Sequence, residues 1–121
     1  MARVRIHVHL GADHSIGPGK VRLLEAVETE GSISAAARAM GMAYRHAWEL
    51  IDDLNRCFRE RVVETASGGR AGGGARLTPF GREVIRRFRH MEAAACDAMA
   101  NDLRALERQM DGSERERRVG S

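Results

Sequence analysis

The stretch 33–54 predicts two helices joined by one tight turn. Its sequence is Ile33-Ser-Ala-Ala-Ala-Arg-Ala-Met-Gly-Met-Ala-Tyr-Arg-His-Ala-Trp-Glu-Leu-Ile-Asp-Asp-Leu54. Ser32 and Ser34 stand at the start of the first helix, where a hydroxyl oxygen can accept a free backbone N–H. Gly41 can adopt the left-handed conformation that ends a helix in a sharp corner. Beyond it, apolar residues recur at three- and four-residue steps and give the second helix one buried stripe, formed by Ala47, Leu50, Ile51 and Leu54.

The outer face of the second helix is polar. It carries Arg45, Glu49, Asp52 and Arg56, with Tyr44 and Trp48 on its flank. A short helix, a glycine corner and a second helix with a polar face form the helix-turn-helix plan, in which the second helix enters the major groove of DNA. An ordinary helical hairpin shows the same pattern, so the rest of the chain must distinguish the two.

The segments before this pair predict a strand, a loop and a third helix. Residues 3–10 alternate strictly between polar and apolar side chains, as a half-buried strand does, and residues 11–19 predict a loop. Residues 20–30 predict a helix that buries Val21, Leu24 and Val27. The histidines at 7, 9 and 14 allow a metal site, but we favour a polar strand face because only Asp13 offers a further ligand nearby.

The segment after Phe58 predicts a β-hairpin. Val62–Thr65 and Ala75–Leu77 are short strands around a loop that contains five glycines. A nucleotide-phosphate loop needs a helix directly after the glycines, whereas a strand follows here. Beside a helix-turn-helix, such a hairpin is a wing, and its Arg70 and Arg76 would lie along phosphates or in the minor groove. A plain flexible turn is the alternative.

Thr78 and Pro79 predict the start of a long helix, since a capping hydroxyl precedes proline at the first helical position. A helix of ~30 residues is ~45 Å long, much longer than a small core can cover. We therefore expect a homodimer through its apolar stripe, rather than a helix that folds back or frays. The stripe contains Val84, Phe88, Met91, Ala95, Met99, Leu103, Leu106 and Met110.

The composition permits a nucleic-acid partner without demanding one. The 121 residues include 20 Lys and Arg against 17 Asp and Glu, a formal net charge of +3. Arginine suits phosphate and guanine, although a G- and C-rich genome gives the same bias. Cys57 and Cys96 have no metal spacing, which fits a reducing cytoplasm. No segment has the pattern of a secretory signal or is apolar for long enough to cross a bilayer.

Three segments together resemble the N-terminal DNA-binding domain of the ModE-type, molybdate-responsive transcriptional regulators. They are residues 41–56, 63–70 and 72–81, which combine tyrosine and tryptophan on the second helix with a glycine-rich wing and a Leu-Thr-x-x-Gly ending. That domain is a winged helix-turn-helix related to the LysR type, and the resemblance spans residues 3 to 105, approximately. Full-length members continue into molybdate-binding domains, for which this sequence has no counterpart. We expect a stand-alone member rather than a truncated chain.

The resemblance implies DNA-binding roles for particular residues. Ala43, Tyr44, Arg45 and Glu49 correspond to recognition-helix residues, and Arg45 would hold guanine through two hydrogen bonds. Trp48 would pack or contact phosphate. The first helix would contact phosphate through Ser34 and Arg38, and Arg70 and Arg76 match the wing. The helix from Pro79 matches the family's dimerisation helix.

The sequence therefore predicts a mainly α fold with a small β-wing. Residues 1–78 form a winged helix-turn-helix domain, residues 79–110 a long dimerisation helix and residues 111–121 a disordered tail. The predicted function is sequence-specific binding of a homodimer to a pseudo-palindromic double-stranded DNA operator in the cytoplasm, without cofactor or metal. The alternative is a winged-helix module that binds proteins and not DNA. An enzyme is not expected, because no nucleophile with a nearby base or paired acid–base cleft is evident.

Overall fold

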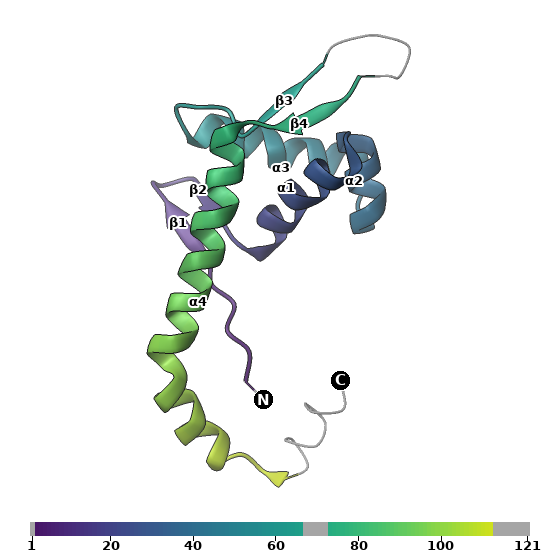
Figure 1. Cartoon of the computed structure of the whole chain (residues 1–121). Coiled ribbons are helices and arrows are strands. Elements are labelled where there is room, and N and C mark those ends of the chain that lie inside the picture. The colour runs from purple at the N-terminus through teal and green to yellow at the C-terminus, as the bar shows by residue number, and fades with distance from the viewer. Residues whose placement is uncertain (1, 67–72, 113–121) are drawn as a thin grey trace.

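The computed structural model describes residues 2–66 and 73–112. Helices α1 to α3 gather beneath the β3–β4 hairpin, and α4 runs from this hairpin past the three helices and away from them (Figure 1). The predicted fold class, mainly α with a small wing and a long last helix, is confirmed. The elements are β1 (Val8–Leu10), β2 (His14–Ile16), α1 (Pro18–Glu30), α2 (Ile33–Met40), α3 (Tyr44–Cys57), β3 (Val63–Thr65), β4 (Ala75–Leu77) and α4 (Pro79–Arg108).

The N-terminal segment forms a β-hairpin, which differs from the expected single strand and loop. The predicted alternation is present, since Val4, Ile6, Val8 and Leu10 are half-buried while the residues between them are exposed. Only Val8–Leu10 pairs as a strand, because β2 offers three partners, from Val8 opposite Ile16 to Leu10 opposite His14. The expectation of a loop over residues 11–19 was wrong where β2 forms.

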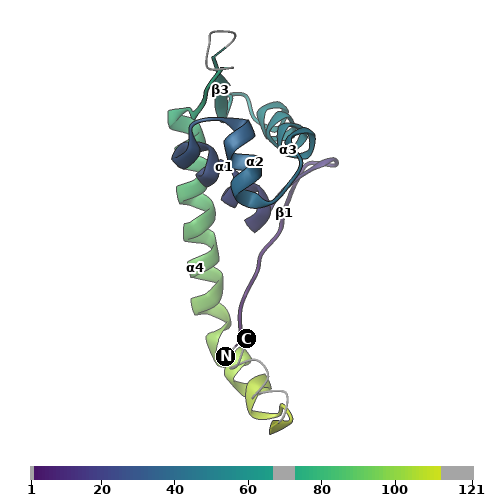
Figure 2. The ribbon, with the colours of Figure 1, turned by 90° about the vertical axis from the view of Figure 1, so that its right-hand side faces the viewer.

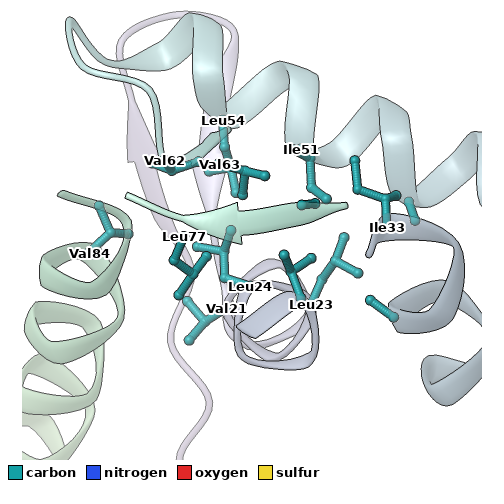
Figure 3. Packing of buried hydrophobic residues seen from close by; sticks show 14 of the residues in the cluster. Val21, Leu23, Leu24, Ile33, Ile51, Leu54, Val62, Val63, Leu77 and Val84 are labelled. Carbon is teal, nitrogen blue, oxygen red and sulfur yellow. The ribbon is translucent and has the colours of Figure 1, made fainter. Parts of the chain in front are cut away.

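The core lies where α1, α2 and α3 meet the wing and the first turns of α4 (Figure 3). Its largest fully buried side chains are Phe88, Leu23, Leu24, Leu54, Val21, Val27, Val62 and Val63. Ala36, Ala37 and Ala47 are also buried, and their small side chains allow α2 and α3 to pack closely in this core. Phe88 is the one aromatic among the fully buried side chains that the structure describes.

The turn between α2 and α3 is a glycine corner. Gly41 has φ 69° and ψ 30°, the left-handed conformation, and its N–H donates to the carbonyls of Ala37 and Arg38. At the other end of α2, the Ser32 hydroxyl accepts the N–H of Ala35 at 3.0 Å. Both predicted helix boundaries are confirmed, and the corner at Gly41 sets the direction in which α3 leaves α2.

The start of α4 is joined tightly to the wing. Thr78 is the N-cap: its hydroxyl accepts the N–H of Gly81 at 2.9 Å and donates to the carbonyl of Arg61 at 2.6 Å. Gly81 lies so close to the residue before β3 that a Cβ there would be 2.2 Å from the carbonyl oxygen of Val62. The Leu-Thr-Pro-Phe-Gly sequence thus packs the first turn of α4 directly onto backbone.

Beyond Arg89, α4 leaves the core. The Arg89 guanidinium donates to Glu25 on α1 at 2.7 Å and to Glu92 at 2.7 Å, and these carboxylates raise the pKa of Arg89. Figure 2 shows the lower part of α4 extending past the three helices. Far along it, Glu107 accepts the N–H of Ala2 at 2.6 Å, so the N-terminal segment reaches the end of this helix.

Candidate nucleic-acid interface

The outer face of α3 carries the predicted recognition residues. Ala47, Ile51 and Leu54 are buried, which turns Tyr44, Arg45, Trp48 and Glu49 to the surface. Tyr44 is 55% exposed and Trp48 is 47% exposed, unusually high values for large aromatic side chains. The Arg45 side chain is 91% exposed and lies 3.6 Å from Glu49, one turn along the helix. Such an ion pair is weak in water, so the guanidinium is available to another acceptor.

The first helix of the pair presents a polar start beside this face. Ser34 and Arg38 are exposed on α2, and Arg38 Nη1 donates to Ser34 Oγ at 3.1 Å. Ala43, the N-cap of α3, is exposed and supplies no side-chain cap, which leaves the first N–H groups of α3 without a capping side chain. Free N–H groups at a helix start favour a nearby anion.

A groove of about 450 Å³ separates these helices from the wing. The N-terminal part of α2, the aromatic pair of α3 and the two wing strands all contribute to its walls, which are Ser32, Ile33, Ser34, Arg38, Tyr44, Trp48, Thr65, Ala66, Gly73, Gly74 and Ala75. The structure therefore brings four of the predicted site residues together around one concave surface. Sequence reasoning missed the wing side of this groove, because those residues are small and carry no charge.

The wing consists of β3 and β4, paired antiparallel from Val63 opposite Leu77 to Thr65 opposite Ala75. Arg76 points outward, with 83% of its side chain exposed, and lies 3.6 Å from Glu64 on the neighbouring strand. Arg70, the other predicted wing arginine, lies outside the described residues. The two-stranded hairpin that the sequence predicted is confirmed at both of its strands.

The predicted dimer stripe divides into two parts. Val84 and Phe88 are buried in the core of the same chain, so they are unavailable to a partner, and the expectation for these two requires correction. The reason is that α4 covers α1 and the wing with its first turns. Farther along, Met91, Met99 and Leu106 are 40%, 41% and 67% exposed, whereas Ala95 and Leu103 are half-buried.

A polar cluster joins the N-terminal hairpin, α1 and α3. Asp53 accepts from Lys20 Nζ at 2.8 Å and lies 3.0 Å from His14 Nδ1, and Lys20 also donates to the carbonyl of Ser15 at 2.7 Å. The hydrogen bond from Lys20 lowers the pKa of Asp53, with a smaller contribution from His14, against the opposing effect of burial. Burial, together with the charge of Asp53, raises the pKa of the Cys57 thiol. Within residues 2–66 and 73–112, no three His, Cys, Asp or Glu side chains are grouped so as to hold a metal ion.

These features define a class of protein. A helix pair with a glycine corner, an exposed face of arginine and aromatic residues on the second helix, and a flanking two-stranded wing form a winged helix-turn-helix protein. Residues 19–82 match the model of the bacterial regulatory helix-turn-helix protein, lysR family. The chain belongs to this family of bacterial regulators.

Individual relatives agree with the resemblance to ModE-type regulators. The chain is 38% identical over 92 residues to the molybdenum transport protein ModE of Azotobacter vinelandii, covering 76% of this chain and 33% of that protein. It is 42% identical over 84 residues to the molybdenum-pterin-binding protein MopA of Rhodobacter capsulatus, covering 69% and 32%. It is 34% identical over 88 residues to the DNA-binding transcriptional dual regulator ModE of Escherichia coli K12, covering 70% and 34%. The chain thus spans about a third of the length of these relatives.

Among the described helices, none combines the length and apolar character that a bilayer-spanning segment requires.

Proposed function

We propose that this chain is a transcriptional regulator that binds double-stranded DNA sequence-specifically as a homodimer in the cytoplasm. The observation that carries the proposal is the exposed face of α3, where an unburied arginine stands beside two unburied aromatic side chains. Exposed aromatic surface is costly to leave in water, and together with an arginine it fits a partner that offers base edges and sugar–phosphate. The similarity to the Escherichia coli relative, a DNA-binding transcriptional dual regulator, supports the same function.

In this proposal α3 enters the major groove and Arg45 donates two hydrogen bonds to guanine. A bidentate contact of this kind contributes ~1–3 kcal/mol of discrimination against other bases. Glu49, 3.6 Å from the guanidinium, pairs with it only weakly, so the guanidinium can leave Glu49 for guanine when DNA binds. Ala43 and Tyr44, at the start of α3, face the bases and sugars nearest the helix N-terminus.

The groove beside α3 takes the sugar–phosphate backbone of one strand. Ser34 and Arg38 supply donors on one wall, Trp48 supplies an apolar surface for deoxyribose, and the wing closes the other side. Arg70 and Arg76 add positive charge along the phosphates or in the minor groove. These contacts position the domain without reading the sequence, and they make its affinity depend strongly on salt.

A second copy of the chain completes the regulator. Beyond Arg89, α4 exposes Met91, Met99 and Leu106 where the helix extends past its own core. A second copy related by a twofold axis buries this stripe by packing the same residues against each other. These residues are Met91, Ala95, Met99, Leu103 and Leu106. A twofold protein then requires a pseudo-palindromic operator with half-sites spaced by the dimer.

The test is selection of bound sequences from randomised duplex DNA by the purified protein at two salt concentrations. We expect a twofold-symmetric motif, and affinity that falls steeply as salt rises. Arg45→Ala is expected to lose preference at one base position by ~10-fold or more, whereas Arg76→Ala weakens binding to all sequences alike. Arg108→Ala, at the opposite end of α4 from the wing, removes the same charge and serves as the matched control. If no DNA is retained at either salt concentration, the proposal is wrong and a protein-binding module takes its place.

A further inference from the structure

The wing is held to the helices at both of its outer edges. On the outer edge of β4, the N–H of Ala75 donates to the carbonyl of Gly31, between α1 and α2, at 2.9 Å. On the outer edge of β3, the partner is a single side chain, Asn55 of α3. A two-stranded hairpin alone is marginal in water, so these two attachments set how the wing stands relative to the recognition helix.

Asn55 makes three hydrogen bonds to backbone at the base of β3. Its Oδ1 accepts the N–H of Val62 at 2.7 Å and the N–H of Val63 at 3.3 Å, and its Nδ2 donates to the carbonyl of Val63 at 3.3 Å. Val63 therefore directs its N–H and its carbonyl away from β4 and towards α3. The amide of Asn55 takes the place that a third strand would occupy beside β3.

The location of Asn55 gives these bonds a functional meaning. Asn55 lies on the same helix as Arg45 and Trp48, and one turn beyond the buried Ile51. The segment that it holds continues directly into β3 and reaches the groove at Thr65 and Ala66. A side chain of the recognition helix itself is consequently one of the attachments that determine the distance between that helix and the wing.

We propose that Asn55 is a positioning residue that sets the wing at the angle at which wing and recognition helix contact DNA together. This inference rests on the proposed DNA-binding function. Without the three bonds, Val62 and Val63 lose their hydrogen-bond partners on α3, and the wing is held by the packing of its buried side chains, by the bond to Gly31 and by the start of α4. The wing then pivots, and its arginines lose their register with the phosphates while α3 still reads the bases.

The test compares Asn55→Leu, which has a similar size and no hydrogen bonds, with Asn55→Asp, which keeps both bonds to Oδ1. Asn101→Leu, an exposed asparagine on α4, is the matched control. We expect Asn55→Leu to bind the selected operator ~10-fold more weakly, with a salt slope smaller by about 1 to 2, and to select the same motif. Hydroxyl-radical footprints of Asn55→Leu are expected to lose protection at the flanks. Asn55→Asp is expected to restore the protection in part, because it lacks only the donor to the Val63 carbonyl.

A double-mutant cycle separates positioning from a general loss of structure. In an Arg70→Ala, Arg76→Ala background the wing has no arginine contacts to misplace, so Asn55→Leu is expected to weaken binding by less than about 3-fold. A general defect weakens both backgrounds equally, and that outcome overturns the proposal. If Asn55→Leu does not fold, Asn55→Ser, whose hydroxyl is too short to replace the amide, is measured in its place with the same expectations.

The two proposals fail in different ways. If the wild type binds its operator and Asn55→Leu shows the wild-type salt slope and footprint, Asn55 does not position the wing, and DNA binding by the chain stands. If the wild type itself binds no DNA, both the proposed function and this role of Asn55 are wrong.

Discussion

Replacing Gly81 by alanine tests the tightest contact between α4 and the wing. The added Cβ would lie 2.2 Å from the carbonyl oxygen of Val62 and 3.1 Å from its carbonyl carbon, and both are backbone atoms that cannot rotate away. The two elements would have to separate by about 1 Å to restore ordinary contact. Overpacking of this kind costs ~1–3 kcal/mol, whereas alanine gains at most ~1 kcal/mol over glycine in a helix.

The clash therefore outweighs the gain in helix propensity, and we expect Gly81→Ala to lower the free energy of unfolding by ~2 kcal/mol. For a domain of this size that is a fall of about 10 °C in the melting temperature, followed by circular dichroism at one protein concentration. Gly19→Ala is the matched control, because the same methyl group at Gly19 in the first turn of α1 meets nothing within 4 Å. It is expected to melt at or slightly above the wild-type temperature. Equal melting temperatures for the two variants would show that α4 does not approach Val62 this closely.

Three further predictions concern the core, the assembly and the response to acid. Phe88→Ala removes the largest fully buried side chain and is expected to cost ~3–5 kcal/mol in urea unfolding at every protein concentration, while a cost under about 1 kcal/mol would place Phe88 outside the core. Met99→Asp introduces a charge on the exposed stripe of α4 and is expected to weaken dimerisation at least ~10-fold in sedimentation velocity, with Asn101→Asp as the control on the other side of the helix; an unchanged molar mass would rule out this stripe as the interface. Because the pKa of Asp53 is lowered, its contribution to stability is present above its unfolded-state pKa and is lost as the pH falls through its folded-state pKa. Asp53→Asn is thus expected to be less stable than wild type at neutral pH, with the difference shrinking below about pH 4 in pH-dependent urea unfolding, and a constant difference would contradict the linkage.

The helix-turn-helix and the wing could be predicted because their signals are local. Gly41 ends α2, Thr78 caps α4, and Ala75–Leu77 forms β4 with the expected bounds. Each of these depends on residues within one turn or one strand of the chain. The exposed face of α3 followed from the same kind of evidence, since the periodicity of its buried stripe determines which residues remain outside.

The features that could not be predicted depend on contacts between distant segments. β2 is only three residues long and exists because β1 pairs with it, and Asp53 joins His14 across 39 positions. The sequence shows which side chains form the apolar stripe of α4, but it does not show whether the same chain or a partner covers them. Val84 and Phe88 were therefore wrongly expected to face a partner. The role of Asn55 was missed because an asparagine near a helix end has no pattern until its acceptors and donors are placed.

The first third of α4 is anchored to the core and the remaining two thirds project from it, so the helix acts as a lever arm. The helix is fixed where Gly81 contacts Val62 and where Phe88 is buried. Beyond Phe88, α4 continues for ~20 residues, or ~30 Å. A tilt of about 10° about this fixed part moves the far end of α4 by about 5 Å, roughly the rise of one helical turn. A small change in the tilt of α4 beside the wing therefore produces a larger displacement at the far end of the helix. Conversely, a displacement of the far end produces a smaller one beside the wing, where Gly81 and the Val62 backbone are already in close contact.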